Sequence, residues 1–203
     1  MPRLYFIRHG ETDWNRAGRL QGGTEVPLNA RGRAQAKAVA AHLTALVEAA
    51  GGPEIAALPF HASPMQRTRQ TIDILREALD LEPGGYAVDP RLREISFGNW
   101  EGRYWSEIRI RDPIGMRDRD ADRWHYAPPG GESYAMVAER LRPFVESVTG
   151  DACVVSHGGV ARVMMVLLGG LEPAEALDMD IWQGKVLAFD NGRGAWLPSP
   201  GHG

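Results

Sequence analysis

The chain of 203 residues contains a single cysteine, Cys153, so no internal disulfide can form. Its neighbours Val154 and Val155 are apolar, which indicates a small buried side chain rather than a redox group. The net charge of −3 and the lack of a basic arm give no reason to expect a nucleic acid partner. No apolar stretch approaches the length of a membrane span, so we expect no membrane partner. Met1-Pro2-Arg3 leads directly into an apolar segment without room for a signal peptide, and we therefore expect a cytoplasmic protein.

Several widespread signatures of catalysis are also missing from the sequence. There is no His-Glu-x-x-His pattern and no Cys/His cluster, which argues against metal-dependent hydrolysis. There is no Walker A pattern, and no Gly-x-Gly-x-x-Gly follows a predicted strand, which argues against the common nucleotide-binding loops. The Gly-x-Ser-x-Gly turn of a serine hydrolase is absent as well.

Short apolar runs predict three buried strands, at residues 4–7, 57–61 and 152–155. Each run leads into a polar loop and then into a segment with apolar residues at helical spacing. This alternation of strand, loop and helix favours a three-layer α/β/α fold with helices on both faces of a parallel-type sheet. Two further apolar runs, 186–189 and 195–197, flank a Gly-rich turn and predict a terminal hairpin. We expect the whole chain to form one domain, since no linker divides it.

Capping residues mark where the predicted helices begin. Asn29 is the expected N-cap of a helix that Gly51-Gly52-Pro53 ends. Ser63 is the expected cap of the next helix, with Pro64 at its first position. A turn rich in Pro and Gly over residues 128–133 precedes a further amphipathic helix.

The remaining segments are polar or irregular. Residues 16–28 predict a long loop, and loops of this length in a compact domain are usually functional or disordered. Residues 81–105 are mostly irregular and precede a short helix from Tyr104 to about Ile110. Residues 111–123 alternate Arg and Asp, which we interpret as a solvated, self-compensating surface segment, with a substrate lid as the alternative. Four aromatic residues either pack in the core, as we expect for at least half of them, or line an outer pocket: Trp100, Tyr104, Trp105 and Trp124.

Polar residues that follow the predicted strands carry the candidate chemistry. Arg8 and His9 follow the first strand, Arg67 lies beyond the second, and His157 follows the third. Ligands of open α/β sheets bind at the carboxyl ends of the strands, so we expect these side chains to converge there. The guanidinium fork of Arg matches phosphoryl oxygens, and a neutral imidazole is a competent nucleophile. The group therefore suits the transfer of an anionic phosphoryl group.

A proton donor and further hydrogen-bond donors complete this set. The leaving oxygen of a phosphoryl transfer needs a proton, and Glu94, between aliphatic Leu92 and Ile95, is the candidate acid. Asn15 is a candidate donor to the equatorial oxygens of the transferred group. We interpret the remaining histidines as structural residues: His42, His61, His125 and His202.

Five ordered motifs resemble the histidine phosphatase superfamily, the phosphoglycerate mutase-like group. They are Arg8-His9-Gly10-Glu11-Thr12 with Trp14-Asn15, the arginine-bearing segment from Ser63 to Thr71, the segment from Leu92 to Gly102, Gly130-Gly131-Glu132-Ser133, and Ser156-His157-Gly158-Gly159. Arg-His-Gly alone is a weak signal, whereas five motifs in family order are a specific one. The resemblance implies a phosphoglycerate mutase-like fold, with a largely parallel sheet that contains one antiparallel strand.

The resemblance also implies a role for each site residue. His9 would be the phosphorylated nucleophile, and Glu94 would be the general acid and then the base for water. The phosphate pocket would be formed by a larger set, namely Arg8, Asn15, Gln21, Gly22, Arg67, His157 and Gly158. The resemblance implies no metal and no organic cofactor for a phosphatase.

The family divides into mutases and phosphatases, and the residues after Glu94 favour a phosphatase. The mutases carry cations there that hold the substrate carboxylate, whereas Ile95-Ser96-Phe97-Gly98 and Trp105 are uncharged. We therefore expect hydrolysis of a small phosphomonoester, with a phosphoprotein as a further candidate substrate. A 2,3-bisphosphoglycerate-dependent phosphoglycerate mutase is the first alternative, and a non-catalytic phospho-ligand binding module is the second. The sequence favours no oligomeric state.

Overall fold

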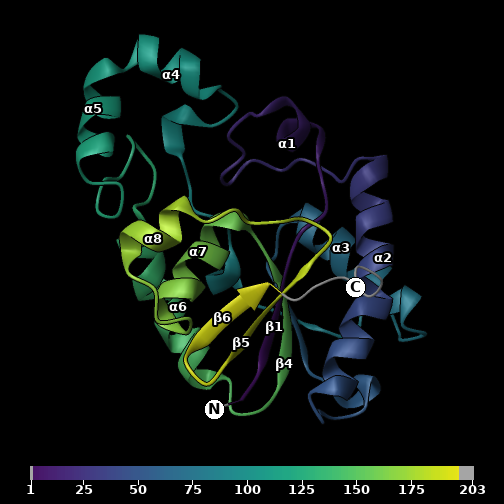
Figure 1. The fold of residues 1–203 in the computed structure, drawn as a ribbon. Coiled ribbons are helices and arrows are strands. Elements are labelled where there is room, and N and C mark those ends of the chain that lie inside the picture. The colour runs from purple at the N-terminus through teal and green to yellow at the C-terminus, as the bar shows by residue number, and fades with distance from the viewer. Residues whose placement is uncertain (1, 197–203) are drawn as a thin grey trace, which may run out of the picture.

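The computed structural model describes residues 2–196, in which six strands form one sheet (Figure 1). The strands are β1 (Leu4–Arg8), β2 (Phe60–Ala62), β3 (Ala87–Val88), β4 (Ala152–Ser156), β5 (Val186–Asp190) and β6 (Arg193–Trp196). Their spatial order is β3-β2-β4-β1-β5-β6. The pairs from β3 through to β1 are parallel, whereas β5 runs antiparallel to both of its neighbours. The mostly parallel sheet with one antiparallel strand is thus confirmed.

Eight α-helices and three short 3₁₀ helices accompany this sheet in the part of the chain that is described. The α-helices are α1 (Asp13–Ala17), α2 (Ala30–Ala49), α3 (Gln66–Ala78), α4 (Trp105–Arg111), α5 (Pro113–Ala121), α6 (Tyr134–Ser147), α7 (Gly158–Leu167) and α8 (Pro173–Asp178). The 3₁₀ helices are η1 (Ile55–Ala57), η2 (Pro90–Leu92) and η3 (Gly98–Trp100). Among residues 2–196, no helix is both long enough and apolar enough to cross a membrane.

Alternate side chains of β1 supply two cores, one on each face of the sheet. Leu4 and Phe6 are buried in a cluster with α6, α7 and α8, and Tyr5 and Ile7 are buried in a second cluster with α2 and α3. This alternation follows from the two-residue period of a strand. Figure 1 shows the same layers, with α2 and α3 on one side of the sheet and α6 to α8 on the other. The predicted three-layer arrangement is confirmed.

A smaller apolar cluster lies under α4 and α5. Buried Ile108 and Met116, from α4 and α5, pack with Trp100 and with Leu20 from the loop after α1. The Trp100 indole N–H donates to Asp112 Oδ2 at 3.0 Å, which ties η3 to the start of α5. Figure 1 shows α4 and α5 standing above the carboxyl edge of β1 and β4. These two helices are therefore placed to form a wall over that edge.

Two predicted boundaries around the second strand are wrong. The strand begins at Phe60, because Pro59 lacks the N–H that a central strand must donate, and residues 55–57 form a 3₁₀ turn instead. Ser63 does not cap the following helix, which begins at Gln66 with Met65 as its N-cap. The Ser63 side chain is buried and its hydroxyl lies 2.8 Å from His157 Nε2, so it serves a different element.

Other predicted elements are confirmed with small changes. Asn29 caps α2 by accepting from the Gly32 N–H. The hairpin of β5 and β6 turns through Asn191 and Gly192, whose positive φ angles suit a tight two-residue turn. Leu197, the last residue of the predicted hairpin, lies outside the described residues. The predicted loop after Asn15 begins later than expected, because Asp13–Ala17 form α1 with Thr12 as its cap.

Candidate active site

The carboxyl ends of three adjacent parallel strands build the site. In the sheet, Arg8 of β1 is paired with Ser156 of β4, and Ala62 of β2 is paired with Val155 of β4. The His9 N–H donates to the Ser156 carbonyl at 2.9 Å, which extends the parallel pairing one residue beyond the strands. The register thus brings His9, His157 and Ser63 together, although they are far apart in sequence.

Hydrogen bonding fixes which nitrogen of His9 is free. His9 Nδ1 lies 2.8 Å from the Gly10 carbonyl, which can only accept, so Nδ1 carries the proton. In the neutral ring Nε2 then holds the lone pair. Burial lowers the pKa of His9 well below its usual value, and the charges of Arg67 and Arg8 lower it further. His9 is therefore a neutral imidazole with Nε2 available for attack.

The Arg8 guanidinium has one nitrogen that is hydrogen-bonded to the protein and another that is buried without a partner among the described residues. Its Nη1 donates to the Ile181 carbonyl at 2.7 Å. Its Nε is buried and has no hydrogen-bond partner among the described residues. Burial lowers the pKa of Arg8 to about 10, so the side chain remains a cation at neutral pH. A buried cation with a free donor indicates a site for an oxyanion.

Arg67 is fully buried at the start of α3, where the loop after α1 holds its guanidinium. Nη1 donates to the Thr24 carbonyl and Nη2 to the Gly22 carbonyl, both at 2.8 Å. Burial lowers the pKa of Arg67, while nearby carboxylates, chiefly Glu94, oppose that shift. The carbonyls of the predicted long loop thus orient the Arg67 guanidinium in the site.

His157 lies behind the site rather than on its surface. Arg67 Nε donates to His157 Nδ1 at 3.3 Å, so the ring proton sits on Nε2 and is donated to Ser63 Oγ at 2.8 Å. Its ring meets that of His9 edge-on, with centroids 5.2 Å apart. Burial lowers the pKa of His157 well below its usual value, with Arg67 the next largest cause. His157 is therefore a neutral residue whose two ring nitrogens are both hydrogen-bonded, and it contacts both His9 and Arg67.

Glu94 is held at the amino end of α7. Its Oε1 accepts from the Gly159 N–H and from the Ile95 N–H, both at 3.0 Å. A side chain at position 159 would collide with this carboxylate, since a Cβ there would lie 2.5 Å from Oε1. Arg140 holds the segment from the other side, donating to the Glu94 carbonyl at 3.3 Å and pairing with Glu132. The acid predicted from sequence is thus firmly positioned.

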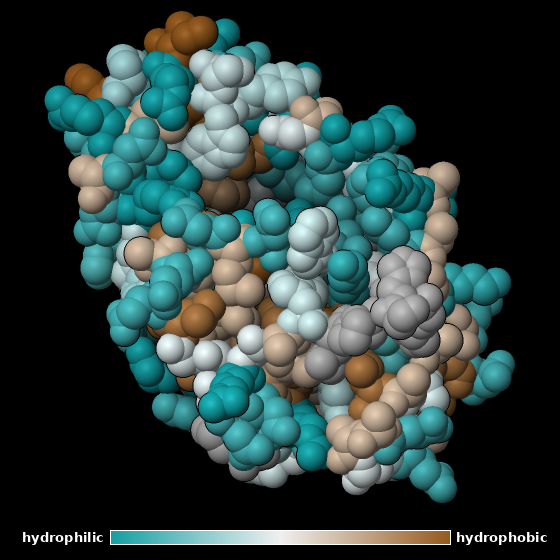
Figure 2. Space-filling view, viewed as in Figure 1, coloured by the Kyte–Doolittle hydropathy of each residue, from teal (hydrophilic) through white to brown (hydrophobic). Residues whose placement is uncertain are grey.

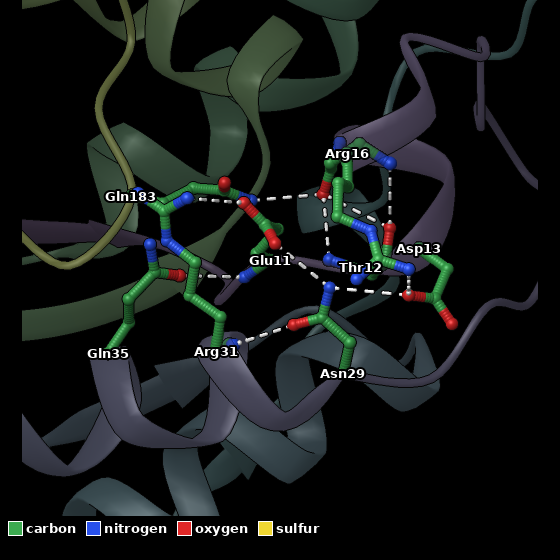
Figure 3. A network of polar contacts seen from close by, with 10 residues as sticks. Glu11, Thr12, Asp13, Arg16, Asn29, Arg31, Gln35 and Gln183 are labelled. Carbon is green, nitrogen blue, oxygen red and sulfur yellow. Dashed lines mark hydrogen bonds and ion pairs between the residues drawn. The ribbon is translucent and has the colours of Figure 1, made fainter.

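The Asn15 amide has one end fixed. Its Oδ1 accepts from the Thr12 hydroxyl at 3.1 Å and from Gln183 Nε2 at 3.0 Å. Its Nδ2 group is therefore the end left to donate to a ligand. The loop beneath is tied to α2, because Asn29 Nδ2 donates to Glu11 Oε1 at 2.9 Å and the Glu11 N–H donates to Gln35 (Figure 3).

A cavity of about 410 Å³ joins these groups, a size suited to a small ligand. The surface in Figure 2 is hollowed between the part formed by α4 and α5 and the rest of the molecule. The cavity is lined by most of the residues predicted from sequence, namely Arg8, His9, Asn15, Gln21, Gly22, Arg67, Glu94 and Gly158. His157 belongs to the same cluster but is not among the lining residues.

The Arg/Asp-rich segment contributes to this cavity, contrary to the preferred interpretation. Arg117 and Asp118 form an exposed ion pair, as expected of a solvated segment. Arg119 and Arg123, however, line the cavity. Arg119 lies on the face of α5 that meets the cavity, and Arg123 follows the end of this helix at Ala121. Trp105 also lines the cavity, whereas Trp100 is buried in the core.

Sequence reasoning missed several residues that support the site. Glu101 accepts from the Gly23 N–H at 2.9 Å and from the Thr24 hydroxyl at 2.7 Å, and it also accepts from the Phe97 N–H. It thus ties the loop that holds Arg67 to the segment that carries Glu94. Tyr134, the first residue of α6, lines the cavity as well. Glu101 lies within the motif from Leu92 to Gly102, but nothing in the sequence reveals these contacts.

Three of the histidines interpreted as structural, His42, His61 and His125, do not line the cavity. His42 is buried on α2, His61 packs edge-on against Phe144, and exposed His125 contacts Asp122. His202 lies outside the described residues. Within residues 2–196, no three side chains of His, Cys, Asp or Glu are grouped so as to hold a metal ion.

A neutral imidazole, two buried arginines and a carboxylate in one cavity suit phosphoryl transfer. The chain belongs to the histidine phosphatase superfamily (branch 1), whose family model matches residues 4–197. A phosphohistidine intermediate is the general mechanism of this family.

Relatives of the chain have two kinds of name. It is 32% identical over 182 residues to phosphoserine phosphatase 1 of Hydrogenobacter thermophilus, covering 85% of this chain and 78% of the relative. It is 29% identical over 204 residues to a probable phosphoglycerate mutase of Serratia proteamaculans, covering 98% and 89%. A solved mycobacterial glucosyl-3-phosphoglycerate phosphatase, in complex with VO₃, superposes with a TM-score of 0.77 at 28% identity and covers 97% of both chains.

Proposed function

We propose that this chain is a metal-independent phosphatase that hydrolyses small phosphomonoesters through a phosphohistidine on His9. The observation that carries the proposal is the state of His9, a neutral ring whose Nδ1 is bound to Gly10 while Nε2 is left for attack in a cavity with Arg8 and Arg67. Relatives named as phosphatases of phosphoserine and of glucosyl-3-phosphoglycerate support a small substrate.

In the first step, His9 Nε2 attacks phosphorus in line with the ester oxygen. The P–N bond forms as the P–O bond to the leaving group breaks, and the departing oxygen takes the proton of the Glu94 carboxylic acid. The alcohol leaves, and the phosphoryl group stays on His9. Glu94 is now a carboxylate, held by the amides of Ile95 and Gly159.

In the second step, water replaces the alcohol. Glu94 removes a proton from the water, whose oxygen attacks phosphorus while the P–N bond breaks. Inorganic phosphate leaves, and His9 and protonated Glu94 are regenerated. The two steps together restore His9 and Glu94 to their starting protonation states, and they use no metal or cofactor.

Other residues of the cavity stabilise the charge on the transferred group. Arg8 and Arg67 supply the cationic donors, and Asn15 adds its Nδ2 group. Gln21, Gly22 and Gly158 complete the wall of the phosphate pocket. In this proposal His157 supports the pocket from behind, through Arg67 and the ring of His9.

The choice of water over a sugar hydroxyl as acceptor rests on the segment after Glu94. Ile95 and Phe97 line the cavity where a mutase has cations. Neither side chain has a charge that could bind the carboxylate of a substrate. Hydrolysis therefore remains the proposal, with the 2,3-bisphosphoglycerate-dependent mutase as the alternative because one relative carries that name.

The test compares wild type, His9→Ala and the surface control His125→Ala on p-nitrophenyl phosphate, with and without EDTA. Wild type and His125→Ala should release phosphate equally well, and EDTA should change neither rate. The rate for His9→Ala should fall by at least about 10³, since it loses the nucleophile. Full activity of His9→Ala, or loss of wild-type activity in EDTA, contradicts the mechanism.

The same preparations separate the alternatives. Efficient interconversion of 2- and 3-phosphoglycerate that depends on a bisphosphorylated primer would establish a mutase. Tight phosphate binding with no turnover of any phosphomonoester would establish a binding module.

A further inference from the structure

The loop between α8 and β5, residues 179–185, crosses the carboxyl edge of the sheet beside the site. The reason is topological. Because β5 is antiparallel to β1, it begins where β1 ends, with Val186 paired to Ile7. The residues just before Val186 therefore pass next to Arg8, the last residue of β1. Figure 1 shows this crossing loop spanning the upper end of the sheet, below α1.

The crossing loop holds two donors of the phosphate pocket. The Ile181 carbonyl accepts from Arg8 Nη1 at 2.7 Å. Gln183 Nε2 donates to Asn15 Oδ1 at 3.0 Å, although the two residues are 168 positions apart in sequence. Ile181 and Gln183 do not line the cavity themselves. Their influence on a bound phosphoryl group must therefore pass through Arg8 and Asn15.

Asn15 needs such an anchor because α1 packs weakly. None of the five residues of α1 is buried, and an isolated helix of this length is unstable in water. The Thr12 N–H and hydroxyl also donate to Asn15 Oδ1, at 3.3 and 3.1 Å, but Thr12 belongs to the same capping turn. Gln183 is the donor that comes from a distant part of the fold. Figure 3 shows it pointing toward the turn that contains Thr12.

These donors decide which end of the Asn15 amide faces the cavity. An amide has one donor end and one acceptor end, and only the Nδ2 end can bind an anion. The Thr12 N–H can donate but not accept, so it selects Oδ1 as the end that the protein holds. Gln183 adds a second neutral donor to the same oxygen. The Nδ2 end is thereby left for the cavity that Asn15 lines.

The crossing loop is fixed on both sides of Gln183. Arg162 donates to the Met179 carbonyl at 2.9 Å. Gly184 has a φ of +70° and lies close to Gln35, since a Cβ on Gly184 would be 3.2 Å from Gln35 Cγ. A polar group that is held in this way can orient a neighbour at little cost in conformational entropy.

We propose that Gln183 is a positioning residue of the reaction, which holds the Asn15 amide so that its Nδ2 group donates to the transferred phosphoryl group. This inference rests on the proposed phosphatase function. Loss of one oriented donor to a developing charge lowers an enzymatic rate by roughly 10²- to 10³-fold. Loss of the group that orients this donor should have a smaller effect, of about tenfold, because Thr12 still holds the amide.

The test is a double-mutant cycle of Gln183 and Asn15. The variants are Gln183→Met, Asn15→Ala and the double variant, and methionine keeps the length of glutamine without its donor. For each protein we would measure kcat and KM with p-nitrophenyl phosphate, the inhibition constant of orthovanadate and the melting temperature. Asp180→Ala, which changes an exposed side chain of the same loop, is the matched control.

Gln183→Met should lower kcat/KM about tenfold and raise the inhibition constant of orthovanadate by a similar factor. Asn15→Ala should lower kcat/KM by more, and the double variant should match it, because Gln183 then has no amide to hold. Gln183→Asn, whose donor is withdrawn by one methylene, should fall between wild type and Gln183→Met. Asp180→Ala should behave as wild type. If Gln183→Met does not fold, Gln183→Asn takes its place in the cycle and decides.

Three results would overturn the inference. Wild-type kinetics in folded Gln183→Met would remove this residue from the reaction. A double variant about ten times less active than Asn15→Ala would show that Gln183 acts by another route, such as the Ile181 carbonyl that holds Arg8. Full activity of Asn15→Ala would remove the donor itself, while His9-dependent hydrolysis would keep the proposed function intact. No turnover of p-nitrophenyl phosphate by wild type contradicts the proposed function and this inference together.

Discussion

At the scale of single residues, His9 and His157 are both buried but differ in the hydrogen bonds of their ring nitrogens. His9 binds a carbonyl through Nδ1, which leaves Nε2 for the cavity. His157 has both nitrogens engaged, by Arg67 and by Ser63. Burial alone therefore does not identify the nucleophile. The hydrogen-bond partners do, because they decide where the lone pair lies.

Ser63 is expected to act as a positioning residue through His157. Ser63→Ala leaves the Nε2 proton of a fully buried ring without an acceptor, which costs about 1–3 kcal/mol. We predict a lower melting temperature and a fall in kcat/KM of roughly tenfold, since the Arg67 contact loses its support. Steady-state kinetics with the exposed control Ser106→Ala check this, and equal activity of the two variants would remove Ser63 from the site.

The two histidines also predict acid sensitivity. Their pKa values are lowered in the folded protein, chiefly by burial, whereas in the unfolded chain they return to about 6.5. Above pH 6.5 both states hold neutral rings, and stability is unaffected. As the pH falls below 6.5, the unfolded chain binds protons that the folded protein refuses, so stability decreases by up to about 1.4 kcal/mol per pH unit for each histidine.

Urea unfolding at pH 7.5 and pH 5.0 measures this effect. The double variant His9→Asn/His157→Asn should lose much less stability between the two values than wild type. His125→Asn, which changes an exposed ring, should behave as wild type. An unchanged pH dependence in the double variant would assign the acid sensitivity to other groups.

At the scale of elements, Glu101 joins the two irregular segments that carry the site. Two backbone hydrogen bonds of Leu20, with Gly102 and Arg103, join the loop that holds Arg67 to the segment that carries Glu94, and the Glu101 carboxylate adds further bonds between them. The arrangement explains how polar loops keep catalytic groups in place.

Glu101→Ala should therefore reduce kcat/KM by tenfold or more while the sheet stays intact. Glu101→Gln keeps one acceptor oxygen and should fall between Glu101→Ala and wild type. Glu139→Ala, which removes an exposed carboxylate of α6, is the matched control. Activity equal to wild type in folded Glu101→Ala would show that the two segments hold their positions without it.

The elements also show what could be predicted from sequence. The strands that end at Arg8 and Ser156 were found because apolar runs lead directly into polar motifs. The two-residue strand β3 was not, because two exposed residues are too few to form a recognisable apolar run. The sequence predicts surface positions for Arg119 and Arg123, since contacts with distant segments decide which side chains in and after α5 meet the cavity.

At the scale of the whole molecule, the sheet separates two cores of different composition. The larger, on the side of α6 and α7, contains Leu141 with no exposed surface. We predict that Leu141→Ala lowers the free energy of unfolding by about 2–5 kcal/mol, because it removes buried apolar atoms and leaves a cavity in the core.

The control is Ile114→Ala on α5, which changes an apolar side chain that is 64% exposed and should alter stability by less than about 0.5 kcal/mol. Urea unfolding of both variants checks the prediction. Equal stability losses would contradict the assigned layers.

The convergence of the site was predictable at this scale, although its contacts were not. Parallel neighbours place Arg8, His9 and His157 at one edge, and that follows from topology alone. That His157 lies behind Arg67, and that Ser63 faces it, depends on side-chain packing between residues some 90 positions apart. Local sequence carries no signal of such contacts.

The central claim is a covalent phosphohistidine on His9, and rapid quenching tests it most directly. The protein is mixed with a ³²P-labelled phosphomonoester and quenched in base, and the labelled residue is identified by peptide mapping. Wild type should carry label on His9, and His9→Ala should carry none. Turnover of substrate without label at His9, or label that persists in His9→Ala, would contradict the account.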